Sequence, residues 1–417
     1  MNALQEFQRN ANTNACDPSL ASYLAIFNRY LSERGYSARH THAEQFYVSH
    51  FVYWMQCQRI GITAIDEALI ERFHHHLPRC DCAGTIRNRS SSAAHAALSH
   101  LLAALRANGW NRRPVPVLTP ADEELRRFDQ YMDRVRGLAP KTREQYLRTV
   151  GRLLTQQFAK RRVAISAIKP ETVHKFIAQQ NKLYATPASA SCIASALRGY
   201  FRYRSACGDR VYQLIGVVNF PANWQLASLP KALSTQDVAR LLDSLGGSYP
   251  SARRSDAVVR CALDLGLRVG EIANLCLDDI DWRAGTLTLR ATKSRREQVL
   301  PLPPTTGRAI AEYLKSERPR TNNRAVFVRH LAPRDQPITA GFVGKLISRA
   351  YARAKLPYTR AHLLRHTMAS RLLASGSSLK EVADVLRHRS LNTTLIYAKL
   401  DSRNLSAVAL PWPGSAA

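Results

Sequence analysis

Two proline-rich stretches divide this sequence into three blocks. They are RRPVPVLTP at 112–120 and NFPANWQLASLP at 219–230. Proline lacks an amide hydrogen and disfavours a helical conformation in the residue before it, so neither stretch is expected to continue a helix. We therefore predict a helical N-terminal domain at 1–113, a second helical domain at 119–210, a third domain at 232–405 and a tail at 406–417.

The charge of the chain indicates the kind of partner it meets. Lys and Arg number 60 against 31 Asp and Glu, which gives a formal net charge of +29, spread along all 417 residues. A folded protein this cationic usually faces a polyanion, most often nucleic acid. General solubility is the alternative, although solubility rarely needs so unequal a balance.

The composition also bears on the compartment. The sequence contains no run of about 18 apolar residues, which predicts no membrane span. Its N-terminus lacks the charged and then apolar blocks of a signal peptide, so we expect a soluble cytoplasmic protein with no membrane partner. Eight cysteines are scattered, mostly in apolar helical contexts. They are expected to be reduced core thiols rather than a disulfide framework.

The first two blocks resemble each other in their apolar pattern. Phe27 and Tyr30 correspond to Phe128 and Tyr131, and Leu98 corresponds to Leu197. An internal duplication and a chance likeness between apolar helices both remain open. In the second block, Arg and Lys alternate with apolar residues, a pattern that suits a helical module with one face on a core and another on phosphates. A plain solvated face is the alternative.

The third block mixes helices with a hairpin. Ser234 precedes Asp237 by three residues and Ser378 precedes Glu381 in the same way, as at helix N-termini. GTLTLR at 285–290 and EQVLPL at 297–302 have the pattern of strands joined by a short turn. We therefore predict a mainly α, multidomain protein whose helical domains precede a mostly helical α+β domain with a small antiparallel sheet.

Two places in the sequence invite comparison with metal sites. His362 and His366 are four residues apart on a predicted helix, but no glutamate lies between them and Arg365 would repel a dication. FHHHLPRCDC at 73–82 contains C-x-C instead of the usual C-x₂₋₄-C, and no downstream pair completes it. We predict no metal at the first place and, at the second, a helix end with incidental histidines.

Several basic and proton-transferring residues instead suit a phosphate. Arg268 follows a small-residue turn in GLRVGE, and His362 and Arg365 share a helix face in HLLRHT. His388 and Tyr397 lie in VLRHRSLNTTLIYAKLD, and Lys293 lies at the predicted hairpin tip. Each has an ordinary structural explanation when taken singly. Together they supply a nucleophile with cationic and proton-transferring groups.

These three segments, in this order, resemble the motifs of the tyrosine recombinase (phage integrase) family. The motifs lie within 266–400, and the helical block at 119–209 resembles the core-binding domain that precedes the catalytic domain in that family. The resemblance implies an enzyme that cuts and rejoins double-stranded DNA through a 3′-phosphotyrosyl intermediate, without metal, ATP or other cofactor. It further implies a homo-tetramer on paired DNA sites, with related hetero-partners also possible, and a nucleoid-associated location.

The resemblance also implies roles for individual residues. Arg268 matches the first family arginine, Lys293 the hairpin lysine, His362 and Arg365 the H-x-x-R pair, His388 the following His/Trp position and Tyr397 the nucleophile. Two fixed guanidinium groups suit the charge that develops on a phosphodiester. His362 is our candidate base and Lys293 our candidate acid. His388 is expected to hydrogen-bond the phosphate or brace Tyr397.

Three neighbouring residues complete the expected site. Glu271 is expected to orient its neighbours, and His366 is expected to be structural. Arg387 stands where many family members carry glycine, so the local turn is expected to differ. The expected function is that of a mobile-element integrase or transposase. The alternatives are a non-catalytic DNA clamp of the same fold and relaxation of supercoils in the manner of a type IB topoisomerase.

Overall fold

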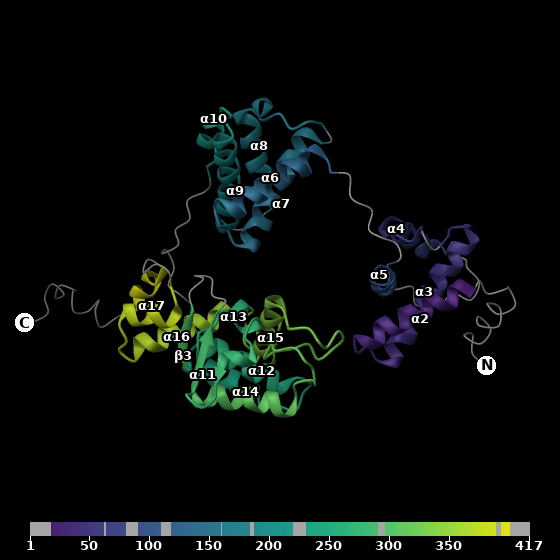
Figure 1. Cartoon of the computed structure of the whole chain (residues 1–417). Coiled ribbons are helices and arrows are strands. Elements are labelled where there is room, and N and C mark those ends of the chain that lie inside the picture. The colour runs from purple at the N-terminus through teal and green to yellow at the C-terminus, as the bar shows by residue number, and fades with distance from the viewer. Residues whose placement is uncertain are drawn as a thin grey trace, which may run out of the picture. The chain divides into compact units, whose positions relative to one another are not determined.

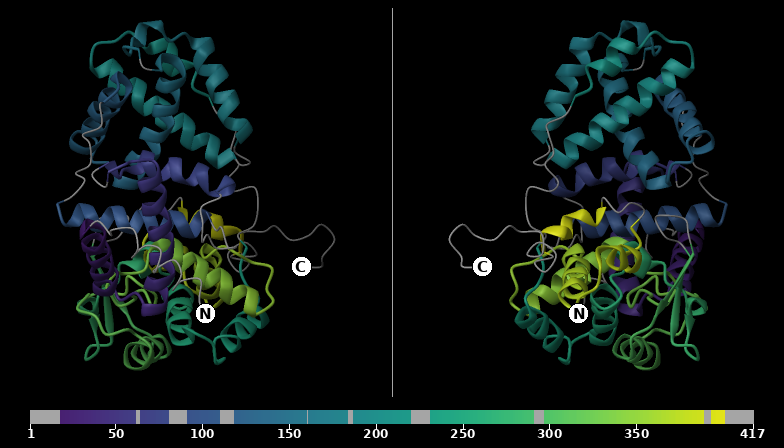
Figure 2. Two further views of the ribbon diagram at one scale, coloured as in Figure 1. Left: turned by 90° about the vertical axis from the view of Figure 1, so that its right-hand side faces the viewer. Right: turned by 90° about the vertical axis from the view of Figure 1, so that its left-hand side faces the viewer.

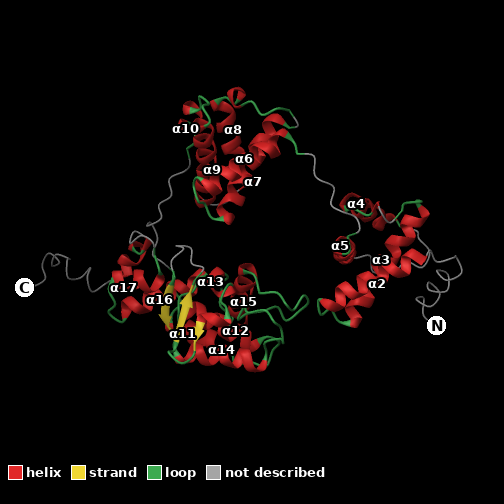
Figure 3. Cartoon of the chain, in the orientation of Figure 1, coloured by secondary structure: helices red, strands yellow, loops and turns green. Residues whose placement is uncertain are grey.

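A computed structural model describes residues 18–61, 64–80, 91–109, 118–159, 161–183, 187–219, 231–290, 297–388 and 393–400. It is mainly α-helical, with one small sheet (Figure 1, Figure 3). Pro114–Ala227 forms one compact unit and the rest of the chain is grouped into another. The boundaries at 113, 119, 210 and 232 that the prolines suggest stay predictions. The N-terminal, middle and C-terminal segments are described one at a time below.

The N-terminal segment folds around its own aromatic core. Its helices are α2 (Pro18–Glu33), α3 (Ala38–Cys57), α4 (Glu67–His76) and α5 (Ser91–Ala107), and the short 3₁₀ helix η2 (Leu77–Arg79) follows α4. Phe27, Phe51 and Phe73 are fully buried there with Leu98. Ser37 and Asp66 cap α3 and α4 by accepting hydrogen bonds from backbone amides.

The middle segment is a second helical unit. It contains α6 (Pro120–Arg134), α7 (Pro140–Phe158), η3 (Ile165–Ala167), α8 (Pro170–Leu183), α9 (Pro187–Ala206) and α10 (Tyr212–Gly216). Helices α6 to α9 each begin at a proline, whose fixed φ suits the first helical turn. Phe128 and Leu197 are buried here, as their counterparts Phe27 and Leu98 are in the N-terminal core. The internal duplication stays a prediction that this correspondence favours.

The C-terminal segment has the predicted α+β composition. Its elements are α11 (Thr235–Asp243), α12 (Ala252–Leu263), α13 (Val269–Ala273), η4 (Leu277–Asp279), β1 (Ile280–Asp281), β2 (Thr286–Leu289), β3 (Gln298–Pro301), α14 (Pro304–Ser316), α15 (Ala340–Arg353), α16 (His362–Ala374), α17 (Leu379–Leu386) and η6 (Leu395–Leu400). The caps at Ser234 and Ser378 are confirmed, because each side chain accepts a hydrogen bond from the third residue of its helix.

The predicted hairpin is confirmed and forms part of a three-stranded antiparallel sheet of order β1-β2-β3. Leu287 pairs with Leu300, and β1 adds a two-residue strand that was too short to predict. The hairpin tip, with Lys293, lies outside the described residues. At the other end of this segment, α16, α17 and η6 pack against one another and carry the last motifs, in the yellow-green to yellow part of the chain (Figure 2).

Two expectations from composition can be compared with this fold. In the part of the chain that the structure describes, no helix is long and apolar enough to cross a membrane. The same part of the chain holds no disulfide bond, but Cys57, Cys192 and Cys207 are exposed. The expectation of core positions therefore fails for these three cysteines, because helical spacing alone does not say which face a residue takes.

Candidate active site

Arg268 is the N-cap residue of the short helix α13 and lies just after a tight turn. Gly266 in that turn has a φ of 57°, in the left-handed region that favours glycine. A Cβ atom there would also lie 2.7 Å from the sulfur of Met368, so a side chain would fit only if Met368 moved. The turn thus brings the Arg268 backbone to the base of α16, on which His362, Arg365 and Met368 lie.

Arg365 is buried and holds this turn in place. Its guanidinium donates hydrogen bonds to the carbonyl oxygens of Gly266 and Leu386. Because Leu386 ends α17, one side chain on α16 joins the turn before α13 to the end of α17. The two family arginines predicted from the sequence are therefore brought to one place.

Arg387, which the sequence marked only as a departure from the family pattern, is part of the charged cluster. Its φ is 57°, so the turn after α17 takes the left-handed conformation that glycine would favour, although arginine occupies the position. Its side chain is 1% exposed, and Nη2 lies 2.9 Å from Glu271 Oε2. The same nitrogen donates to the Gly266 carbonyl at 3.1 Å. The expected difference between this turn and that of other family members stays a prediction.

Glu271 connects the arginines. Its Oε1 accepts from Arg268 Nη1 at 2.7 Å, and its Oε2 accepts from the Arg268 amide at 2.9 Å and from Arg387. Burial works to raise the pKa of Glu271, but Arg387 and Arg268 outweigh it and the pKa is lowered. The carboxylate is therefore ionised, and its contacts agree with the predicted orienting role.

The cluster carries more positive charge than it can neutralise by itself. Three guanidinium groups, those of Arg268, Arg365 and Arg387, share one carboxylate. Burial, Arg268 and Arg387 all lower the pKa of Arg365, which means that its charged form is disfavoured in this surrounding. An anion bound beside the cluster would relieve this cost, and a phosphodiester offers such an anion.

Tyr397, the predicted nucleophile, lies in η6 and is 2% exposed. Its hydroxyl oxygen lies 2.6 Å from His366 Nδ1. Burial raises the pKa of Tyr397 to about 12, although Arg365 acts in the opposite direction. Burial, His362 and Arg365 lower the pKa of His366, so this imidazole is neutral near pH 7. A neutral imidazole nitrogen can accept the hydroxyl proton.

The sequence had assigned His366 a structural role and His362 that of the base. His362 is exposed on α16, with its ring centroid 6.3 Å from that of His366. Among the described residues, it is His366 that is hydrogen-bonded to the hydroxyl of Tyr397. This contact depends on how η6 packs on α16, which motif spacing does not show.

His388 lies just after α17. Its Nδ1 is 2.7 Å from the hydroxyl oxygen of Thr394, a buried residue that precedes η6. Burial, Arg365 and Arg268 lower the pKa of His388 to about 4, so it is neutral at pH 7 and can act as a hydrogen-bonding group. Arg268, Arg365, His388 and Tyr397 are thus brought together, and His362 lies on the same helix as Arg365.

The chain is similar to known proteins over most of its length. The model of the phage integrase family matches residues 231–403, and that of the phage integrase N-terminal SAM-like domain matches 125–206. A protein of Sinorhizobium fredii named as integrase/recombinase y4rA is 33% identical over 402 residues, 95% of this chain and 95% of its own. The chain therefore belongs to the phage integrase family and is a tyrosine recombinase.

Particular relatives and solved structures extend the comparison. Tyrosine recombinase XerA of Thermococcus kodakarensis is 29% identical, covering 69% of this chain and 94% of its own. The fold is similar to that of XerH site-specific recombinase in a complex with its difH substrate, with a TM-score of 0.54 over 82% of this chain, 95% of that chain and 18% identity. It is also similar to the Tn1549 transposon integrase bound to transposon end DNA, with a TM-score of 0.51 over 69% of this chain, 100% of that chain and 16% identity.

Proposed function

We propose that this tyrosine recombinase is a site-specific recombinase of a mobile element that cuts and rejoins DNA through a 3′-phosphotyrosyl intermediate. The observation that carries the proposal is a buried tyrosine hydroxyl, 2.6 Å from a neutral imidazole nitrogen, close to a cluster of guanidinium groups with surplus positive charge. Nucleophile, proton acceptor and phosphate-binding cations are the parts that a phosphoryl transfer needs.

The proposed cleavage step transfers the scissile phosphate from the 5′ oxygen of the DNA to the oxygen of Tyr397. The oxygen of Tyr397 attacks the scissile phosphorus, its proton passes to a histidine, and the bond from phosphorus to the 5′ oxygen breaks. The leaving 5′ oxygen takes a proton, for which Lys293 is the candidate donor. Rejoining is the same step in reverse with a 5′ hydroxyl of the partner strand. The covalent phosphotyrosyl intermediate conserves the energy of the phosphodiester bond that was broken, so the exchange needs no ATP.

The arginines act on the charge that builds up during attack. Arg268 and Arg365 are proposed to bind the non-bridging oxygens of the phosphate. Arg365 is held by two backbone carbonyls and Arg268 by Glu271, so both are positioned before DNA arrives. Groups that need no reorganisation during the reaction stabilise a transition state most effectively.

We infer that His366 is the residue that accepts the proton from Tyr397, in place of His362. The inference depends on the hydrogen bond between Nδ1 and the tyrosine hydroxyl. In this account His362, which is exposed on α16, contacts the phosphate together with Arg365, as the sequence assignment of the H-x-x-R pair implies.

The pH dependence of cleavage distinguishes the two histidines. A base must be neutral to accept a proton, and burial lowers the pKa of His366 from its usual value near 6.5. The cleavage rate should therefore be constant from about pH 8 to about pH 6.5 and fall only at lower pH. The measurement is the single-turnover rate on a nicked duplex. His366→Gln should lose most of this rate and its dependence on acid; if His362→Gln does so instead, His362 is the base.

A duplex nicked near the cleavage point tests the proposal as a whole. The short fragment released after cleavage diffuses away, so the enzyme remains covalently attached to DNA. We expect a denaturant-stable adduct with the wild-type chain, which a non-catalytic clamp would not give. A supercoiled plasmid with a single site separates exchange from topoisomerase-like relaxation, because relaxation needs no second site. Failure to form any adduct on any tested duplex from its own element would contradict the proposal.

The proposed partner is double-stranded DNA. The charge of +29 favours it, and solved structures of similar fold are described as complexes with DNA. Neutralised phosphates release counterions, so binding should weaken by about 10³-fold or more when salt rises from about 50 to about 200 mM. Fluorescence anisotropy of a labelled duplex measures this. An affinity that changes less than about tenfold would mean that few phosphates are contacted.

A homo-tetramer on two DNA sites, with related proteins as further partners, and association with the nucleoid are parts of the same proposal. The similarity to a transposon integrase and to an S. fredii integrase/recombinase supports a role in mobile DNA. Light scattering with and without a two-site duplex measures the number of subunits in the complex.

A further inference from the structure

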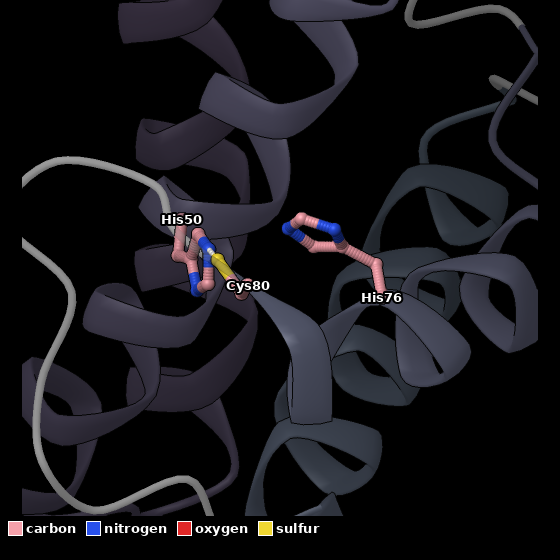
Figure 4. A group of neighbouring side chains, drawn as sticks. All are labelled: His50, His76 and Cys80. Atoms are coloured by element: carbon pink, nitrogen blue, oxygen red, sulfur yellow. Dashed lines mark hydrogen bonds between the residues drawn. The ribbon is translucent and has the colours of Figure 1, made fainter.

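Three metal-binding side chains converge in the N-terminal segment. His50 comes from α3, His76 ends α4, and Cys80 follows η2. One ligand atom from each of the three lies within 4.8 Å of the others, and His50 Nε2 is 3.2 Å from Cys80 Sγ. Figure 4 shows the His76 ring approaching this pair from the α4 side.

The local fold explains why the three meet. Helix α4 ends at His76, and Pro78 in η2 turns the chain so that Cys80 returns toward α3. The ring of Phe73 lies 5.1 Å from that of His50, and the ring of Trp54 lies 5.8 Å from that of His76. The side chains are therefore held by aromatic packing and need little rearrangement to meet an ion.

The donor set suits zinc. Zinc binds imidazole nitrogen and thiolate sulfur at about 2.0–2.3 Å, so two ligand atoms on a tetrahedral ion lie about 3.5 Å apart. The separation of His50 Nε2 from Cys80 Sγ, 3.2 Å, is of that size, and the ligand atom of His76 lies within 4.8 Å of both. His50 and Cys80 are buried and His76 is partly buried. Binding of the ion requires that the Cys80 thiol lose its proton, because the thiolate is the ligand.

We propose that His50, His76 and Cys80 bind one divalent zinc-type cation. Water takes the fourth position of the tetrahedron in this proposal. The ion joins the end of α4 to α3 and so stabilises the N-terminal segment. The role is structural and independent of the chemistry at Tyr397, and it holds whether or not the proposed recombination is correct.

The sequence favoured a helix end with incidental histidines at 73–82, since C-x-C has no downstream partner pair. Cys82 lies outside the described residues and takes no part in the proposal. The missing partner is His50, which lies 30 residues before Cys80 and on another helix. His50 is too distant in the sequence to be part of a motif of closely spaced ligands.

Cobalt provides a direct test on the full-length protein, because tetrahedral Co²⁺ replaces Zn²⁺ and absorbs visible light. After removal of metal by a chelator, wild-type protein should bind one Co²⁺ per chain at this site. The spectrum should show the d–d bands of tetrahedral cobalt and a near-ultraviolet band from thiolate to cobalt. Adding Zn²⁺ should displace the Co²⁺ and remove both the d–d bands and the thiolate band. Bound Zn²⁺ should also raise the temperature at which the N-terminal segment unfolds.

Matched variants identify the ligands. His76→Gln and Cys80→Ser should each weaken Co²⁺ binding by at least about a hundredfold. Loss of a residue that only supports a ligand weakens metal binding by about 10- to 100-fold, so loss of a ligand should cost at least as much. Cys80→His keeps a ligand, so it should retain the d–d bands and lose the thiolate band. His75→Gln and Cys57→Ser are controls, because both side chains are exposed. Both should bind Co²⁺ as the wild type does.

The alternative is a packed core in which the Cys80 thiol and His50 are simply hydrogen-bonded. In that case wild-type protein shows no thiolate-to-cobalt band, or shows one that persists in Cys80→Ser. Either outcome overturns the proposal. Circular dichroism verifies that each variant is folded, and the wild-type spectrum decides the question even if a variant is not.

Discussion

Replacing Tyr397 with phenylalanine should abolish the covalent protein–DNA adduct on a nicked duplex, with a loss of at least about 10⁴-fold in rate. The hydroxyl is the proposed nucleophile, and no other group in its place can form the phosphodiester link. The aromatic ring stays in its contacts with Ala369, Val382 and Leu386. The lost hydrogen bond to His366 is expected to cost only about 1 kcal/mol of stability, so the variant should fold.

The controls separate chemistry from folding. Tyr397→Phe should bind the duplex with the affinity of the wild type, measured by anisotropy. Tyr351→Phe removes a hydroxyl from another buried tyrosine of the C-terminal segment and should keep the adduct. An adduct that persists in Tyr397→Phe would show that a different residue attacks the phosphate.

Replacing Glu271 with leucine should destabilise the C-terminal segment by about 3–5 kcal/mol, because the change leaves the buried guanidinium of Arg387 without its carboxylate. The two side chains are 4% and 1% exposed, so water cannot solvate the charge that remains. Scanning calorimetry of the full-length protein measures the effect as a lower transition temperature. Asp278→Ala breaks an exposed ion pair with Arg324 and should change that temperature little.

The pair Glu271 and Arg387 also permits a double-mutant cycle. Arg387→Gly relieves the left-handed conformation of residue 387, a gain of about 1 kcal/mol, but it removes one partner of Glu271. The double variant Glu271→Leu with Arg387→Gly should be more stable than Glu271→Leu alone, since the most deeply buried guanidinium left without a carboxylate, that of Arg387, is removed as well. Additive effects would mean that the two groups do not depend on each other.

Local chemistry predicted much of the fold because the signals were local. Ser234 and Ser378 cap helices through residues three positions away, and the hairpin partners Leu287 and Leu300 lie within one short stretch. The core-facing aromatic residues and the motif arginines were also visible in the sequence, and the division at the prolines stays a prediction. These features depend on neighbours in the chain and on periodic spacing.

What could not be predicted depends on packing between distant segments. Arg387 reaches Glu271 across 116 residues, and His366 reaches Tyr397 across 31. The meeting of His50 with Cys80 likewise needs α4 to turn back on α3. In each case the residue was visible, but its partner is set by the angle at which two helices pack, which no spacing rule records.

The burial of Tyr397 bears on how such an enzyme avoids cutting DNA at sites other than its own. A chain with a charge of +29 will rest on DNA of any sequence for much of the time. Tyr397, the proposed nucleophile, is 2% exposed and its pKa is raised to about 12, so its hydroxyl is protonated and buried during these encounters. In the proposed mechanism, cutting then requires that η6 release the hydroxyl toward a phosphate. Restraint of the nucleophile would protect the host genome from random nicks, while the cationic surface keeps the search for the correct site fast.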